Sequence, residues 1–336
     1  MAQPVQDAAP HGGVPVPAPP TGLSEFLGRV LDQLSLTAWL PAAMLVGNLA
    51  VLLQLRALPT AGVGDALTAL TDKPLGVLVV LLFALVLAAL VTQSMEFSAI
   101  RLLEGYWGHS RVGTALGSWR IRRHCRRRRR LLDKGDAVQR KAFAAARERL
   151  LDLPGADPVL VAAVEAGARG GDTSAFPSDV LERAGLVDWQ EDAPAGLLRK
   201  MSAVDESFAG YPANHRVLPT RLGNTLRSAE DALVNVGGGA LRGYVIRNLH
   251  RIPPAVLQEH DQYRNRLDMY CMFVVVCGAL AVAAPALLLS HADPAFGAGA
   301  GLGYAVLAVV GYRAAVASGR GYATTLLAID GAITSD

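Results

Sequence analysis

The chain has 336 residues, and its mean hydropathy of +0.30 argues against an ordinary soluble domain. Hydrophobic residues make up 51% of the positions, while the formal net charge is only +3. The apolar residues are concentrated in a few long runs, which are typical of a membrane protein.

The N-terminal residues 1–22, "MAQPVQDAAPHGGVPVPAPPTG", are rich in Pro and Gly and contain no Lys or Arg. They lack the basic start of a cleaved signal peptide, and we expect a disordered tail. Residues 23–34 follow with apolar side chains at helical spacing and charged ones opposite. This pattern predicts an amphipathic helix in the membrane interface. Its apolar positions are Leu23, Phe26, Leu27, Val30, Leu31 and Leu34.

Four apolar runs are each long enough to cross the hydrocarbon layer as a helix: 36–55, 75–95, 269–289 and 296–316. None has the polar face that a soluble core helix needs. They predict two transmembrane hairpins, at 35–95 and 269–317. Between the hairpins, residues 96–268 show helical periodicity and no alternating strand beyond four or five residues. The predicted fold class is therefore all-α, with a helical domain inserted between spans 2 and 3.

A cluster of arginines follows the second span, whereas the loop at 57–74 has only Lys73. Since Lys and Arg near membrane spans favour the cytoplasmic side, we expect 96–268, both termini and the C-terminal tail at 318–336 to be cytoplasmic. The cluster could also hold anionic lipid, bind nucleic acid, or form a solvated or partner-binding face. Its members are Arg120, Arg122, Arg123, Arg126, Arg127, Arg128, Arg129 and Arg130.

Two further helical extensions are predicted from the middle section. The second span continues into "EFSAIRLLEGYWG", and a helix from Pro254 runs without a break into the third span. We expect these two extensions to pair as a stalk on which the remaining helices pack.

Charged residues in two segments form a candidate polar network or partner face. After span 2 they are Glu96, Arg101 and Glu104, next to an aromatic pair that suits a membrane interface. In "PTRLGNTLRSAED", cations and an amide recur every three residues and end in carboxylates. This stripe could pair with the first segment or hold an anionic ligand. Its members are Arg221, Asn224, Arg227, Glu230 and Asp231.

Together, "EFSAIRLLEGYWG" and "LPTRLGNTLRSAED" resemble a family of uncharacterised actinobacterial multi-span integral membrane proteins. The resemblance covers about thirty residues and the layout of the spans. It implies a multi-span bacterial membrane protein and brings no known activity.

Glycines open the fourth span in two overlapping small-xxx-small patterns, which favour close helix packing within a chain or in a homo-oligomer. They are Gly297, Gly299, Gly301 and Gly303. No phosphate loop, nucleophile elbow or zinc motif occurs, and the three cysteines form no CxxC pair. We therefore expect no catalytic residue, no metal and no cofactor.

These patterns favour a non-enzymatic bacterial inner-membrane protein that anchors a cytoplasmic helical domain. We expect that domain to dock a protein partner or organise an assembly, with membrane lipids around the spans. One alternative is an oligomeric channel, favoured by the Gly-rich fourth span. Another is a regulator that responds to anionic lipid or nucleic acid through the arginine cluster.

Overall fold

The computed structural model describes residues 36–58, 60, 62–152, 154, 157–233, 245–289 and 294–334. Within these ranges the chain is helical and has no strand, which confirms the all-α prediction. The tail at 1–22 and the interfacial helix at 23–34 lie outside the described residues. The helices are α2 (Leu36–Ala57), α3 (Val63–Thr71), α4 (Leu75–Glu104), α5 (Arg111–Leu151), α6 (Pro158–Ala168), α7 (Ser178–Gly185), α8 (Ala195–Ala209), α9 (Arg221–Ala232), α11 (Pro254–Leu287) and α12 (Pro294–Thr334), with 3-10 turns η1 (Asn214–Arg216) and η2 (Leu249–Arg251).

Four of these helices, α2, α4, α11 and α12, are long and apolar enough to cross a membrane. They contain the four predicted spans, except that α11 ends at Leu287, two residues before the predicted end of the third span. The protein is a membrane protein. Many large apolar side chains of α4 point outward, for example Phe83, which is 66% exposed. Such outward apolar surface is expected where a helix faces lipid.

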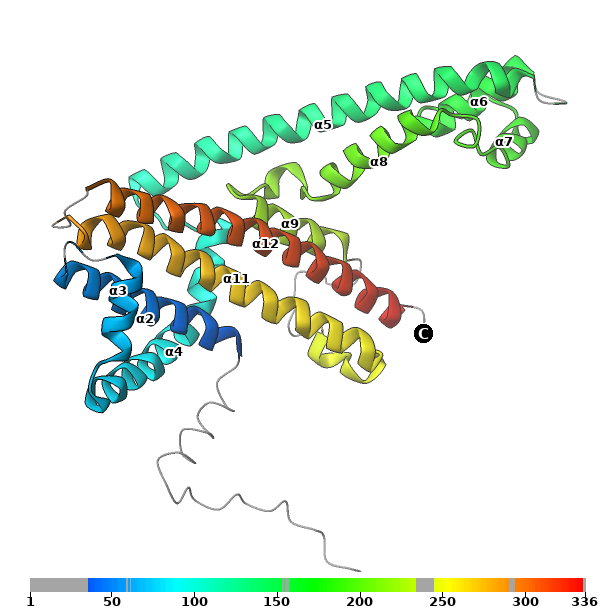
Figure 1. Cartoon of the computed structure of the whole chain (residues 1–336). Helices are drawn as coiled ribbons and strands as arrows, with labels where there is room; N and C mark the ends of the chain where they lie inside the picture. Colours follow the sequence, from blue (N-terminus) through cyan, green and yellow to red (C-terminus); the bar gives the residue numbers. More distant parts are fainter. Residues whose placement is uncertain are drawn as a thin grey trace, which may run out of the picture.

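The antiparallel helices α11 and α12 lie together, with α2 and α4 packed against them (Figure 1). Leu52 and Leu55 of α2 pack with Leu280 of α11 in one apolar cluster. A polar link crosses the same region, because the Tyr304 hydroxyl donates to Asn48 Oδ1 at 2.7 Å. The amide of Asn48 is thereby paired inside the first span.

The glycines of the fourth span divide into two pairs. A Cβ on Gly297 would lie 3.1 Å from Leu288 Cβ, and one on Gly301 would lie 2.9 Å from the Ala281 carbonyl oxygen. A Cβ on Gly299 or Gly303 would meet no atom within 4 Å. The first pair therefore allows α12 to approach α11, while the second faces away from the neighbouring helices.

The expected stalk is present in part. Near the membrane the extension of α4 does pair with α11, since Ala99 and Leu267 belong to one apolar cluster. Helix α11 does begin at Pro254 and continue into the membrane, but its first turns pack against the end of α12. There Ile252, Val256 and Leu257 contact Ile329 and Ile333. Farther along the chain toward Pro254, the partner of α11 is therefore α12, because α12 continues as a helix to Thr334 where a tail at 318–336 was expected.

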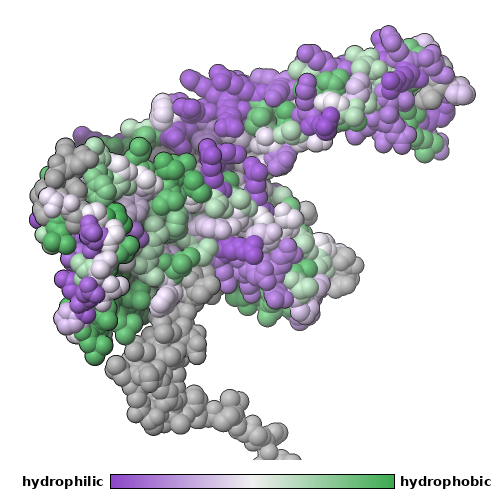
Figure 2. All heavy atoms as spheres, in the orientation of Figure 1, coloured by the Kyte–Doolittle hydropathy of each residue, from purple (hydrophilic) through white to green (hydrophobic). Residues whose placement is uncertain are grey.

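Helices α5 and α8 run side by side and lead away from the membrane helices as an arm that carries α6 and α7 at its far end (Figure 1). The core of the arm includes Phe143 and Leu150 of α5, Val164 of α6, and Trp189. Figure 2 shows the contrast in surface chemistry, with a hydrophilic arm and more apolar surface around α2 and α4.

Candidate functional site

The arm joins the membrane helices where α4 ends against α9. Helix α4 terminates at Gly105, whose φ of 105° is the left-handed conformation that glycine adopts readily. A Cβ at Gly105 would lie 2.3 Å from Pro219 Cγ, and one at Gly223 would lie 2.2 Å from the Glu104 carbonyl oxygen. Both glycines are therefore required for the two helix ends to meet. We call this contact the α4–α9 joint.

Polar side chains from "PTRLGN" hold the joint. The Thr220 hydroxyl donates to the Glu104 carbonyl oxygen at 2.8 Å and accepts from the Gly223 N–H, which caps α9. Asn224 is 1% exposed; its Oδ1 accepts from the Leu218 N–H at 2.7 Å and its Nδ2 donates to the Leu218 carbonyl at 3.0 Å. The buried amide thus satisfies the backbone that leads into α9.

The predicted charges of the two segments do meet at this joint, through an aromatic ring. Arg227 Nη2 donates to the Tyr106 hydroxyl at 2.5 Å, and the Arg101 guanidinium lies 4.0 Å from the centroid of the Tyr106 ring. The other side of Arg227 pairs with Glu230 at 2.7 Å. Tyr106 therefore links cations from α4 and α9.

Arg216 of η1 completes the network. It pairs with Glu230 at 2.8 Å and also contacts Asp231, whose second oxygen accepts from the Ala213 N–H at 2.7 Å. The segment before α9 is thereby tied to its last turn. Arg216 and Tyr106 were not among the predicted site residues. Tyr106 was interpreted as one of an aromatic pair at the membrane interface, and nothing in the spacing of Arg216 marks it.

Two predicted members lie apart from these contacts. Glu96 is on α4 two turns before the joint, and its Oε1 is buried without a hydrogen-bond partner in the described part of the chain. Arg221 borders a small recess with Arg127 and Arg320, next to the hydroxyls of Tyr211 and Thr225. The Arg221 backbone N–H, together with that of the next residue, donates to the Tyr312 hydroxyl of α12.

The arginine cluster is a continuous part of α5 and divides between two faces. Arg120 Nε donates to the Pro219 carbonyl at 3.2 Å, and the Arg128 guanidinium lies 4.9 Å from the centroid of the Phe208 ring. These two arginines hold α5 against the joint and α8. The other six are exposed: Arg122, Arg123, Arg126, Arg127, Arg129 and Arg130.

His124 lies on the inner face of α5 and is 8% exposed. Its Nδ1 is 3.2 Å from the Tyr211 hydroxyl. Burial and the positive charges of nearby arginines, first among them Arg120 and Arg127, lower the pKa of His124 to about 4. The ring is therefore neutral at physiological pH and serves as a hydrogen-bonding residue between α5 and the end of α8.

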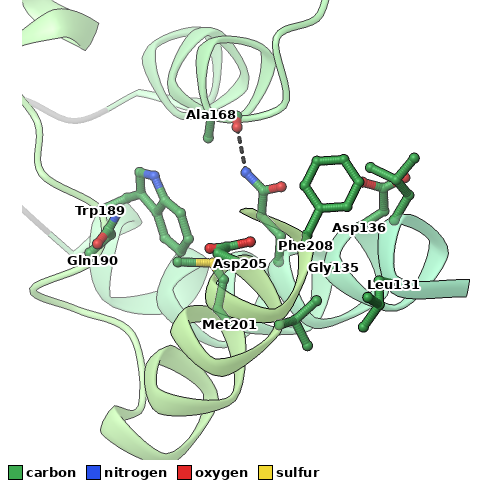
Figure 3. A pocket seen from close by; sticks show the side chains of 12 residues that line it. Leu131, Gly135, Asp136, Ala168, Trp189, Gln190, Met201, Asp205 and Phe208 are labelled. Atoms are coloured by element: carbon green, nitrogen blue, oxygen red, sulfur yellow. Dashed lines mark hydrogen bonds between the residues drawn. The ribbon is translucent and has the colours of Figure 1, made fainter. Parts of the chain in front are cut away.

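A cleft of about 320 Å³ opens between α5 and α8 in the middle of the arm (Figure 3). Its lining includes the apolar side chains of Trp189, Met201 and Phe208, with the carboxylates of Asp136 and Asp205 beside them. Gln139 donates a hydrogen bond to the Ala168 carbonyl, which joins α5 to the end of α6. This arm cleft combines apolar surface with negative charge, so it suits an apolar ligand that carries a cation.

The cleft was missed in the sequence, although one signal was present. Met201, Val204 and Phe208 recur at helical spacing in α8 and mark one apolar face. The chain segments that supply the opposite wall, around Gly135 and Trp189, are distant in sequence and show no such pattern. Across the ranges that the structure describes, no group of three or more His, Cys, Asp or Glu could hold a metal ion.

Comparison with known proteins adds no relative, since no family model, no curated protein and no solved structure matches the chain.

Proposed function

We propose that the protein is a non-enzymatic docking protein of the bacterial inner membrane. The four membrane helices anchor the arm, and the arm cleft receives an apolar segment of a partner protein that carries Lys or Arg. The observation that carries this proposal is the cleft itself, in which Trp189, Met201 and Phe208 line an opening beside two carboxylates.

The rigid connection between membrane and arm supports a docking role. Tight backbone contacts at Gly105 and Gly223 fix the end of α4 to α9, and Arg120 of α5 donates to the Pro219 carbonyl beside them, which holds the arm to this joint. A partner held in the cleft would therefore be kept at a defined position relative to the membrane, as an assembly platform requires.

The orientation follows from charge. Arginines crowd the chain immediately after α4, while Lys73 and Arg56 are the basic residues that flank the loop between α2 and α4. By the positive-inside tendency the arm lies in the cytoplasm, where partner proteins are present. The resemblance to multi-span actinobacterial proteins agrees with this location.

The test is proximity labelling in a bacterial host, with the labelling enzyme fused after Asp336. Asp205→Arg reverses a charge that lines the cleft, and the side chain is exposed, so the fold should tolerate the change. Asp133→Arg is the matched control, because it makes the same charge change on an exposed position of α5 that does not line the cleft.

At matched abundance, the proposal expects one or more partners to be labelled by the wild type and the control and to be reduced at least tenfold in Asp205→Arg. Identical labelling profiles in all three proteins would remove the cleft as the docking site. Turnover of a small-molecule substrate by the purified protein would overturn the non-enzymatic part of the proposal.

A further inference from the structure

One exposed face of α5 changes from apolar to basic along the helix. Val112, Leu116, Trp119, Arg123, Arg126 and Arg130 follow one another at steps of four and three residues, so they share a face. We call these six residues the α5 stripe. The inner residues Arg120, His124 and Arg128 lie on a different face, where they contact the joint and α8.

The apolar half of the stripe is unusually exposed for large side chains. Val112 is 77% exposed, Leu116 47% and Trp119 49%. Apolar residues at consecutive turns of one helix face form a continuous patch, which needs a partner surface. Trp is the side chain that favours the boundary between hydrocarbon and headgroups, because it has an apolar ring and a polar N–H.

The basic half of the stripe is uncompensated. Arg123, Arg126 and Arg130 line a surface groove with Trp119, and the carboxylates of the described residues form no ion pair with them. Exposed guanidinium groups without acidic partners attract a layer of negative charge, and Arg pairs readily with phosphate oxygens.

The position of the stripe next to membrane helix α4 indicates where this negative charge comes from. On α4, Phe97 and Leu102 remain 70% and 49% exposed, so apolar surface continues to the last turn of this membrane helix. The chain then passes through 105–110 and starts α5 at Arg111. The apolar half of the stripe is thus close to the membrane boundary in the chain, and the arginines come after it.

We propose that the α5 stripe binds the anionic surface of the membrane. Val112, Leu116 and Trp119 insert among the lipid headgroups, while Arg123, Arg126 and Arg130 contact lipid phosphates. The order of the residues along α5 matches the order of chemistry across a lipid leaflet, from apolar to phosphate. This lipid contact would fix the direction in which the arm leaves the membrane, and it does not depend on any ligand of the arm cleft.

The test uses the full chain in nanodiscs, with Cys125, Cys271 and Cys277 replaced and a nitroxide label at Leu116→Cys. A second label at Ala144→Cys, on an exposed position in the outer half of α5, is the reference. The discs contain phosphatidylcholine alone or increasing fractions of phosphatidylglycerol. The readout is the accessibility of each label to oxygen, which enters lipid, and to a water-soluble nickel complex.

With phosphatidylglycerol, the label at position 116 should become accessible to oxygen and protected from nickel, while the label at 144 stays accessible to nickel. Replacing Arg123, Arg126 and Arg130 by Gln should raise the fraction of phosphatidylglycerol needed by several-fold, since each arginine near an anionic surface contributes about fivefold in binding. The matched triple change, Arg140→Gln, Lys141→Gln and Arg147→Gln, removes three exposed charges outside the stripe and should have little effect.

Nickel accessibility at position 116 that equals that at 144 in every lipid mixture would overturn the proposal. So would protection of the stripe by a DNA or RNA oligonucleotide in discs of phosphatidylcholine with no response to phosphatidylglycerol, an outcome that would assign the arginines to nucleic acid.

Discussion

Gly223 lies against the last carbonyl of a membrane helix, since a Cβ at this position would come within 2.2 Å of the Glu104 oxygen. The close approach lets Thr220 donate to the same carbonyl group and cap α9. A helix end that would otherwise leave its carbonyl groups to water is thus satisfied by the neighbouring helix. The end of α4 and the start of α9 are thus fixed to each other by backbone contact, to which the side-chain network of the joint is added.

Substitution of Gly223 by Ala should therefore weaken the joint. The added methyl group cannot fit without moving the backbone of α4 or α9, and we expect a loss of about 1–3 kcal/mol in the free energy of unfolding. The measurement is thermal unfolding of the purified protein in detergent, followed by circular dichroism.

Gly117→Ala in α5 is the matched control, because a Cβ there meets no atom within 4 Å. Alanine has the higher helix propensity, so this variant should be neutral or more stable by up to about 1 kcal/mol. Equal destabilisation of both variants would contradict the role of close contact at Gly223.

Asn224→Ala removes few atoms but should strongly lower the stability of the protein. The change leaves the N–H and the carbonyl of Leu218 without their partners in a partly buried place, which costs about 1–3 kcal/mol in the free energy of unfolding. Hydrogen exchange at the Leu218 amide should also accelerate, because this N–H loses its acceptor. Asn214→Ala, at an exposed position in η1, is the comparison and should leave exchange at Leu218 unchanged.

Local patterns were sufficient for the parts of the fold that depend on a single helix. The sequence predicts the four spans and the continuous α11 from the length of the apolar runs. It also predicts the helix at 221–232, because its capping residue Thr220 directly precedes it. The meeting of "EFSAIRLLEGYWG" with "PTRLGNTLRSAED" was also anticipated as a charge pairing. Its geometry was not, since the contacts run through Tyr106 and through backbone at two glycines.

Contacts between distant segments account for the differences. The pairing of α4 with α11 was predicted, but α12 was missed as the second stalk helix because the polar residues after Val316 suggested a tail. Leu326, Ile329 and Ile333 nevertheless give that segment an apolar face. The walls of the arm cleft come from α5, α8 and the segment at Trp189. These segments are distant in the sequence, so no local pattern predicts that they form a cleft.

The corrected stalk can be tested by crosslinking. In a chain without its native cysteines, Leu257→Cys should crosslink with Ile329→Cys, because both positions belong to one apolar cluster. The same Leu257→Cys should fail to crosslink with Phe97→Cys on α4, because α4 meets α11 nearer the membrane, around Leu267. The chain is treated with a short bifunctional maleimide, and a crosslink is detected as a change in mobility on a denaturing gel. Crosslinking of the second pair alone would contradict the contact between α11 and the end of α12.

His124 should make stability depend on pH in a defined window. Its pKa is about 4 in the folded protein, against roughly 6.5 for an unperturbed histidine, so the unfolded chain binds a proton between these values while the folded chain does not. The free energy of unfolding should therefore fall as the pH drops from about 6.5 to about 4, by up to roughly 3 kcal/mol from this group, and should be unaffected by it above that window. His124→Asn keeps a polar group beside Tyr211 but cannot titrate, and it should show a correspondingly shallower decline in Tm over the same range. Parallel declines in the wild type and the variant would show that His124 does not cause the effect.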